Sequence, residues 1–291
     1  MKTQLDCIAC LANQAIKICK EALPDQEDKQ LELARLAIKK ISDSDLSDPP
    51  PVIASKIQGI IKKEVNSTDL YKEVKDQANQ LVLSLLPKLE TIIEQSADKQ
   101  ETALMLAIGG NIIDVAIGNM PRTEEIQEAV EQSLNIPIDG NIDGFIKDVK
   151  QARKILYLCD NTGEICLDKL LIKQLGPEKI CAVVRGMPTL NDATLKDAKT
   201  CGLTDIVAVI DNGTDIPGTI LNECPESFQK RFAEADLIIS KGQGNYETLN
   251  EIQAPIYFLL KVKCDVVAEL TNLKKGSLLL KKSDSFTRQN Q

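Results

Sequence analysis

The sequence predicts an α/β protein: a Rossmann-like three-layer αβα domain with a mostly parallel sheet, joined to an all-α N-terminal region. Up to about residue 150, apolar residues recur at helical spacing and no segment alternates with a period of two. From about residue 152, short β-branched runs alternate with stretches of helical length, as in right-handed βαβ crossovers. We therefore expect an α-helical region over 1–150 and a Rossmann-like α/β domain over 151–291 that carries the functional site.

The N-terminal region consists of successive amphipathic stripes separated by breaks. The apolar residues of the first stripe are Leu5, Ile8, Ala12, Ala15, Ile16 and Cys19. The run Pro49-Pro50-Pro51 interrupts the pattern, because proline is excluded from helix interiors. Three further helical stretches follow at about Asp69–Gln95, Asp98–Gly118 and Thr123–Ser133.

The second region contains six apolar runs of strand length. They are Ile155–Cys159, Ile180–Val184, Ile206–Ile210, Leu237–Ser240, Ile256–Leu260 and Ser277–Leu280. Runs that are apolar throughout are typical of parallel strands, which are buried on both faces of their sheet. The stretches between most of them are long enough for helices that cover the sheet.

Composition excludes several classes of function. The 291 residues carry 35 Lys and Arg against 43 Asp and Glu, a net charge of -8, and aromatic residues make up 3%. An acidic chain with few aromatic rings lacks the clustered cations and stacking surfaces of a nucleic-acid-binding protein. The chain has no histidine, which excludes imidazole metal ligands and a histidine general base.

Nothing in the sequence predicts secretion or membrane insertion. The start MKTQLDCIAC has no apolar run of signal-peptide length, and nowhere do eighteen apolar residues follow one another. Nine cysteines without a secretory signal predict reduced thiols and a cytoplasmic protein. The sequence makes no prediction about oligomeric state.

Polar residues follow four successive predicted strands. Ligands of parallel sheets bind beyond the carboxyl ends of the strands, so these residues are the candidates for a site. They are Asp160, Asn161, Thr162 and Glu164; Arg185, Asn191 and Asp192; Asp211 and Asn212; and Lys241, Gly242, Gly244 and Asn245. Each group also has a structural interpretation, because such residues cap helices, form turns or let the backbone turn tightly. Their convergence on one edge favours a functional site.

The chemistry of that edge points to phosphate and a hard cation. The first strand–helix turn lacks GxGxxG, and GxxxxGK[ST] is absent, so dinucleotide-binding and P-loop proteins lose support. Carboxylates and an amide oxygen suit Mg²⁺ or Mn²⁺, with other divalent transition metals as alternatives. Arg185, Lys241 and the N–H groups around Gly242 and Gly244 suit a phosphate. This combination predicts phosphomonoester hydrolysis.

Six sequence motifs resemble those of the metal-dependent damage-control phosphatases, a former domain-of-unknown-function family that includes acidic-residue methyltransferase-like proteins. The motifs are DNTGE, RGMPTLND, SKGQGNYE, KCDVVA, DCIAC and GGNIID. The last two resemble the stand-alone microbial branch, and the resemblance extends from Asp6 to about Ala268.

The resemblance implies an α-helical region on a Rossmann-like domain, with one divalent cation at the strand ends. By this likeness Asp160, Asn161 and Asp192 are the metal ligands, and Lys241 is a phosphate-binding residue. Asn111 and Asp114 correspond to polar residues presented by the helical region. We assign catalytic roles to Asp160, Asp192 and Lys241. Substrate-binding roles go to Asn111, Asp114, Glu164, Arg185, Gly242, Gly244 and Asn245.

Two features allow more than one interpretation. Asn111 and Asp114 share a helix face inside an apolar stretch, where they either reach a ligand or bond to nearby backbone. Cys7 and Cys10 form a CxxC pair, with Cys264 as a third thiol suggested by the family pattern. Burial, metal binding and redox chemistry are the alternatives for these thiols.

We expect a divalent-metal-dependent phosphatase that hydrolyses phosphomonoesters of small metabolites, such as sugar phosphates and damaged or surplus phosphorylated intermediates. The predicted partner is that small metabolite, with no nucleic acid and no membrane. One alternative is an S-adenosylmethionine-dependent carboxyl methyltransferase, which the acid-bearing first turn disfavours. Another is a non-enzymatic thiol–metal or metabolite-binding protein.

Overall fold

The computed structural model describes residues 1–110, 125, 128 and 132–284. Its strands form one seven-stranded sheet in the order β1-β7-β6-β5-β2-β3-β4. The strands are β1 (Ile138–Gly140), β2 (Ile155–Leu158), β3 (Ile180–Val184), β4 (Ala208–Asp211), β5 (Leu237–Lys241), β6 (Ile256–Lys261) and β7 (Leu278–Lys282). The predicted fold class is confirmed.

The central strands pair in parallel and in register. β2 lies between β3 and β5, so that Ile155 faces Ile180 on one side and Leu237 on the other. β7 runs antiparallel to β6 and parallel to β1. Because β2 and β3 are neighbours, the segments that follow them leave the sheet at the same edge.

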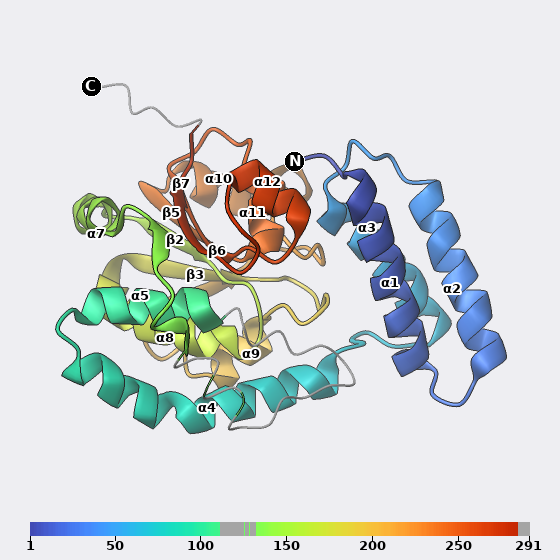
Figure 1. The fold of residues 1–291 in the computed structure, drawn as a ribbon, viewed down its shortest axis with the longest axis horizontal. Helices are drawn as coiled ribbons and strands as arrows, with labels where there is room; N and C mark the ends of the chain where they lie inside the picture. Colours follow the sequence, from blue (N-terminus) through green and yellow to red (C-terminus); the bar gives the residue numbers. More distant parts are fainter. Residues whose placement is uncertain (111–124, 126–127, 129–131, 285–291) are drawn as a thin grey trace.

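Helices cover both faces of the sheet (Figure 1). On one face, apolar side chains of α4 (Lys72–Gln95), α5 (Lys99–Gly109), α7 (Ile142–Gln151), α8 (Glu164–Leu175) and α9 (Leu195–Thr200) share a core with alternate strand residues such as Tyr157 and Ile239. On the other, α10 (Glu226–Ala233), α11 (Gln243–Leu249) and α12 (Asp265–Thr271) pack on the intervening residues, such as Leu158 and Phe258. This alternation explains why central strands such as β2 and β3 are buried and apolar along their length.

The first three helices form a separate unit with its own apolar core. α1 (Leu5–Ala22), α2 (Glu27–Ser42) and α3 (Pro50–Glu64) bury residues such as Ile18, Ala37 and Ile57 against one another. Figure 1 shows them side by side at one end of the molecule, beyond the edge of the sheet. α3 begins at Pro50, where the missing N–H leaves no intrahelical bond unmade.

The structure adds a strand where the sequence predicts only helices. β1 lies within the predicted all-α region and pairs with β7. Its three residues are too few to show a period of two, and the partner that supplies its hydrogen bonds lies about 140 residues away. α4, α5 and α7 also precede residue 151 and share the core of the sheet. The division of the chain into domains at residue 150 stays a proposal.

None of the helices in the described part of the chain is both long and apolar enough to cross a membrane.

Candidate active site at the strand ends

The turns after β2 and β3 are bonded to each other. The backbone N–H of Ala193 donates to the carbonyl of Asp160 (2.8 Å), and Asn161 and Asp192 form an isolated antiparallel bridge. The N–H and hydroxyl of Thr162 both donate to the carbonyl of Asn191. The structure therefore brings together Asp160, Asn161 and Asp192, and all three side chains are buried.

The side-chain amide of Asn161 has a defined orientation. Its Nδ2 donates to Oδ2 of Asp160 (2.9 Å) and to Oε2 of Glu164 (3.3 Å). Since both carboxylates accept from the nitrogen, the amide oxygen Oδ1 points away from them and remains an acceptor. An amide oxygen that remains an acceptor is a suitable ligand for a hard divalent cation, together with carboxylates.

Arg185 lies behind the two aspartates. Its Nε donates to Oδ2 of Asp192 (2.6 Å), and its terminal nitrogen Nη2 lies 3.8 Å from Oδ1 of Asp160. Nη1 donates to Oδ1 of Asn245 (3.3 Å), whose Nδ2 donates in turn to the carbonyl of Lys241 (2.8 Å). Arg185 is 1% exposed, so it supports the aspartates from within the protein.

The pKa values of the two aspartates rise despite this guanidinium. Burial raises the pKa of Asp160 well above its usual range, and the negative charges of Asp192 and Glu164 raise it further, against Arg185 and Lys263. Burial also raises the pKa of Asp192, and Arg185 opposes that rise. The charged forms of this pair are therefore disfavoured until a further positive charge arrives.

Lys241 lies in a second, fully buried network. Its Nζ donates to Oε1 of Glu164 (2.7 Å), Oδ1 of Asp168 (2.6 Å) and the carbonyl of Ala107 (2.8 Å), which engages all three ammonium hydrogens. The Tyr157 hydroxyl also donates to Asp168 (2.7 Å). Burial lowers the pKa of Lys241, but Asp168 and Glu164 outweigh it and the pKa is raised overall.

The glycines of the turn after β5 allow close packing. A Cβ atom on Gly242, where φ is +79°, would lie 1.9 Å from Oδ2 of Asp160. A Cβ atom on Gly244 would lie 2.2 Å from the carbonyl oxygen of Pro217. The N–H of Gly242 donates to the carbonyl of Leu259, so this group is already engaged within the sheet edge. Glycine at 242 lets the turn pass directly beside the Asp160 carboxylate.

A cavity of about 830 Å³ lies over these turns, between the sheet edge and the N-terminal helices. Of the predicted site residues, Asp160, Asn161, Asp192 and Gly244 line it. Glu164, Arg185, Lys241, Gly242 and Asn245 do not line it and lie behind or beside those that do. Asn111 and Asp114 lie outside the described residues.

Sequence reasoning missed several cavity residues. Lys263 lines the cavity, and its charge lowers the pKa of Asp160. Its place in the KCDVVA motif could have identified it. Polar residues of α1, among them Asn13, Gln14, Lys17 and Glu21, form another part of the wall. No motif distinguishes them from the ordinary polar face of a helix.

The three thiols of the CxxC pair and Cys264 line the same cavity. Cys7 and Cys264 are half-buried, Cys10 is exposed, and Nε2 of Gln243 lies 3.4 Å from Sγ of Cys264. Burial raises the pKa of Cys7 and of Cys10. Across the described residues, no group of three or more Cys, Asp or Glu is arranged to hold a metal ion.

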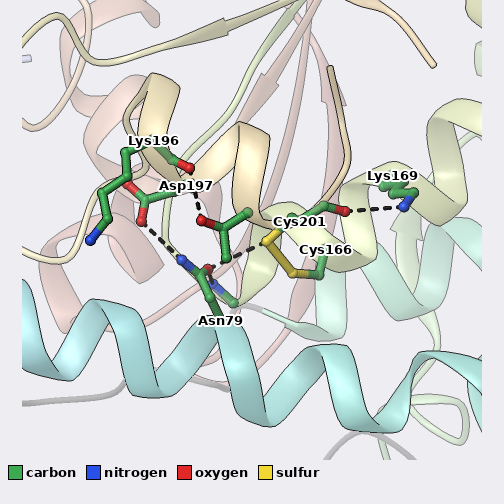
Figure 2. Close-up of a disulfide and its surroundings, with 8 residues drawn as sticks. Asn79, Cys166, Lys169, Lys196, Asp197 and Cys201 are labelled. Atoms are coloured by element: carbon green, nitrogen blue, oxygen red, sulfur yellow. Dashed lines mark hydrogen bonds between the residues drawn. A yellow bond between two sulfur atoms is a disulfide. The ribbon is translucent and has the colours of Figure 1, made fainter. Parts of the chain in front are cut away.

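One disulfide joins the two helices that follow the site turns. Cys166 in the first turn of α8 is bonded to Cys201 at the end of α9, with Cα atoms 5.4 Å apart. The expectation that every cysteine is reduced is therefore wrong for this pair. Figure 2 shows Asn79 of α4 beside the disulfide, where its Nδ2 donates to Asp197 (2.9 Å). Its Oδ1 accepts from the N–H of Gly163 (2.8 Å), which anchors the turn after β2.

The fold and this cavity define the class: an α/β protein with a cavity at the carboxyl ends of its parallel strands, the usual place for a ligand in such sheets. The family model of the damage-control phosphatase ARMT1-like domain matches residues 3–279, so the chain belongs to that family. The predicted family is confirmed.

Several similar proteins come from archaea and cover nearly the whole chain. An uncharacterized protein of Methanocaldococcus jannaschii is 37% identical over 97% of this chain and 96% of its own. A damage-control phosphatase of Pyrococcus horikoshii is 35% identical over 96% of this chain and 97% of its own. The crystal structure of a DUF89 family protein from Pyrococcus horikoshii matches with a TM-score of 0.89 at 33% identity, covering 98% of this chain and all of that one.

Proposed function

We propose that the protein is a divalent-metal-dependent phosphatase acting on phosphomonoesters of small metabolites in the cytoplasm. Family membership and the named relatives support the general activity. The observation that carries the proposal is the pair of buried carboxylates, Asp160 and Asp192, on the wall of a metabolite-sized cavity. Buried acids facing a cavity, with pKa values raised by burial, are typical of sites that bind a cation.

The side chains fit a hard divalent cation, Mg²⁺ or Mn²⁺. Asp160, Asp192 and Oδ1 of Asn161 would hold it, because all three residues line the cavity and the bonds of the Asn161 nitrogen to carboxylates leave its oxygen as an acceptor. A bound cation polarises the phosphoryl oxygens and neutralises charge that develops during hydrolysis. Arg185 keeps Asp192 in place through the 2.6 Å bond from its Nε.

Among the lysines in the part of the chain that the structure describes, Lys263 is the best placed to bind the substrate phosphate. It lines the cavity and is close enough to Asp160 to shift its pKa. An ammonium group gains charge-assisted hydrogen bonds from phosphate oxygens in both the ground and transition states. In this proposal Lys241 has an indirect role. Its ammonium group binds the Glu164 carboxylate, and Glu164 in turn orients the side-chain amide of Asn161.

Phosphate release from a panel of phosphorylated metabolites tests this proposal. EDTA-treated protein should be inactive, and added Mg²⁺, Mn²⁺, Co²⁺ or Ni²⁺ should restore turnover to different extents. If no ester is hydrolysed with any metal, while calorimetry detects S-adenosylmethionine binding, the methyltransferase alternative replaces ours. If no ester is hydrolysed and anaerobically purified protein holds sulfur-ligated iron or zinc, the thiol–metal alternative does.

A further inference from the structure

The cavity is much larger than a phosphate and its cation need. Pockets of about 300–1,000 Å³ hold whole small molecules, and this one measures about 830 Å³. Its wall opposite the sheet includes one face of α1, from Asp6 to Glu21, on which cavity-lining residues recur every three or four positions. The organic part of a phosphorylated substrate therefore has to meet this face.

Two polar atoms in the wall have no hydrogen-bond partner among the described residues. They are Oε2 of Glu21, on the last turn of α1, and Nδ2 of Asn191, next to Asp192. Both atoms are inaccessible to solvent, and a buried polar atom without a partner costs free energy. One is an acceptor and the other a donor, so a ligand that satisfies both must donate and accept.

The backbone of Asn191 is fixed by the same bonds that build the site. Its carbonyl accepts from the N–H (2.9 Å) and the hydroxyl (3.1 Å) of Thr162, while its side-chain nitrogen is unused. Asn191 therefore links the aspartate turns to the rest of the cavity wall. Lys17, one helical turn before Glu21, lines the cavity and partly offsets the effect of burial on the Glu21 pKa.

We propose that Glu21 and Asn191 determine substrate specificity by binding hydroxyl groups of the substrate's organic part. Both residues line the cavity, so a rotation of either side chain brings its unpartnered atom to the cavity surface. There a substrate hydroxyl donates to Oε2 of Glu21, and a hydroxyl oxygen accepts from Nδ2 of Asn191. Phosphate esters of polyols and sugars carry such groups, whereas aryl phosphates such as p-nitrophenyl phosphate do not. This inference rests on the proposed phosphatase function. It gives a role to Glu21, which no motif identified, and a specific role to Asn191 of the RGMPTLND motif.

Comparing sugar phosphates with an aryl phosphate distinguishes a role in substrate binding from a purely structural role of Glu21 and Asn191. Glu21→Ala and Asn191→Ala should each lower kcat/KM for ribose 5-phosphate and glucose 6-phosphate by about tenfold to a hundredfold, the usual effect of losing a hydrogen bond to a buried or charged group. Turnover of p-nitrophenyl phosphate should change by less than about twofold, because it makes neither bond. Glu21→Gln, which keeps an acceptor oxygen, should recover part of the loss on sugar phosphates.

Lys20→Ala is the matched control, since Lys20 is an exposed neighbour on α1 that does not line the cavity. Equal losses on both classes of ester, or unchanged kcat/KM for the sugar phosphates, would overturn the inference. If the wild type hydrolyses no ester, the proposed function fails. Calorimetry on Mn²⁺-loaded protein then tests the binding role of Glu21 without turnover. Glu21→Ala must then weaken binding of ribose 5-phosphate about tenfold or more while leaving inorganic phosphate binding unchanged; equal effects refute the inference.

Discussion

Two acid clusters lie side by side at the carboxyl edge of the sheet, and they differ in what surrounds them. In one, Glu164 and Asp168 share the ammonium group of Lys241, and neither carboxylate lines the cavity. In the other, Asp160 and Asp192 are supported by Arg185 from behind and line the cavity in front. The Asn161 amide nitrogen joins the clusters, since it donates to Asp160 and to Glu164.

The difference shows how similar residues divide between structure and chemistry. The Lys241 cluster is fully buried, and its lysine donates short hydrogen bonds to both carboxylates. Asp160 and Asp192 line the cavity instead, and what distinguishes them from Asp168 is this access, because burial raises the pKa of all three carboxyl groups. In the proposed function the cation therefore binds the second cluster, which lines the cavity, and not the first, which does not.

Breaking the Lys241 cluster should have the largest effect. Lys241→Met removes the cation and leaves Glu164 and Asp168 buried without it, which should lower the free energy of unfolding by about 3–5 kcal/mol. Urea denaturation measures the change, with Lys230→Met on the exposed face of α10 as a control. The triple variant Lys241→Met, Glu164→Gln, Asp168→Asn should regain much of the loss. An unchanged midpoint for the single variant would show that Lys241 is not a structural cation.

Removing one charge from the cavity-facing cluster should affect turnover more than folding. Asp160→Asn and Asp192→Asn should each reduce kcat by at least ~10²-fold, the typical effect of one preorganised electrostatic group. Metal-free stability should be kept or should rise, because the two carboxylates repel each other when no cation lies between them. Kinetics with Mn²⁺ and thermal melts with and without metal measure both effects.

Asp211→Asn serves as the matched control for these variants. Asp211 ends the neighbouring strand β4 and bonds to the N–H of Gly213, but it does not line the cavity. Asparagine keeps an acceptor for that bond, so turnover should stay within about twofold of wild type. Full activity and full metal-induced stabilisation in both Asp160→Asn and Asp192→Asn would place the cation elsewhere.

The pH dependence of stability should report on Asp168 of the Lys241 cluster. Burial raises the pKa of Asp168 to about 6, with Lys241 opposing and Glu164 adding to the rise. Between pH 4 and 6 the folded state then holds a proton that the unfolded state has lost, so this group makes stability fall as pH rises. Asp168→Asn should reduce that fall by on the order of 1–3 kcal/mol. Urea midpoints of EDTA-treated wild type and variant at pH 4, 5, 6 and 7 measure it, and identical slopes would contradict the raised pKa.

The thiols beside the cavity should have the smallest effect. Cys7→Ser combined with Cys10→Ser should change kcat/KM by less than about twofold, because the proposed chemistry uses oxygen ligands for a hard cation. The assay is phosphate release with Mg²⁺ or Mn²⁺, accompanied by a thermal melt. A complete loss of turnover in a folded double variant would mean that the thiols take part in the reaction.

The sequence was sufficient for the fold class and for the position of the aspartates. Runs such as Ile155–Leu158 and Ile180–Val184 are apolar throughout, so they had to be buried on both faces of a parallel sheet. Residues that directly follow neighbouring parallel strands share an edge, and Asp160 and Asp192 do meet there. Predictions of this kind succeed because they depend on local pattern and on the geometry common to all parallel sheets.

The surroundings of Lys241 could not be predicted in the same way. The sequence shows a lysine at the end of β5, a position that suits phosphate binding as well as a buried ion pair. The outcome depends on Asp168 and Glu164 of α8 and on the carbonyl of Ala107 in α5. Those partners come from helices whose packing on the sheet is set by many weak apolar contacts.

By itself, the sequence determined the strands from β2 to β7, the crossovers between the central ones and the acids at their ends, because hydrophobic pattern and strand direction are local properties of the chain. Only the tertiary structure decided which polar side chains face open space. The docking of α1–α3 beside the sheet makes Glu21 and Lys17 part of the cavity wall, and the pairing of β1 with β7 completes one edge. These arrangements join residues distant in sequence, and the free energy that selects them is shared among the three apolar cores.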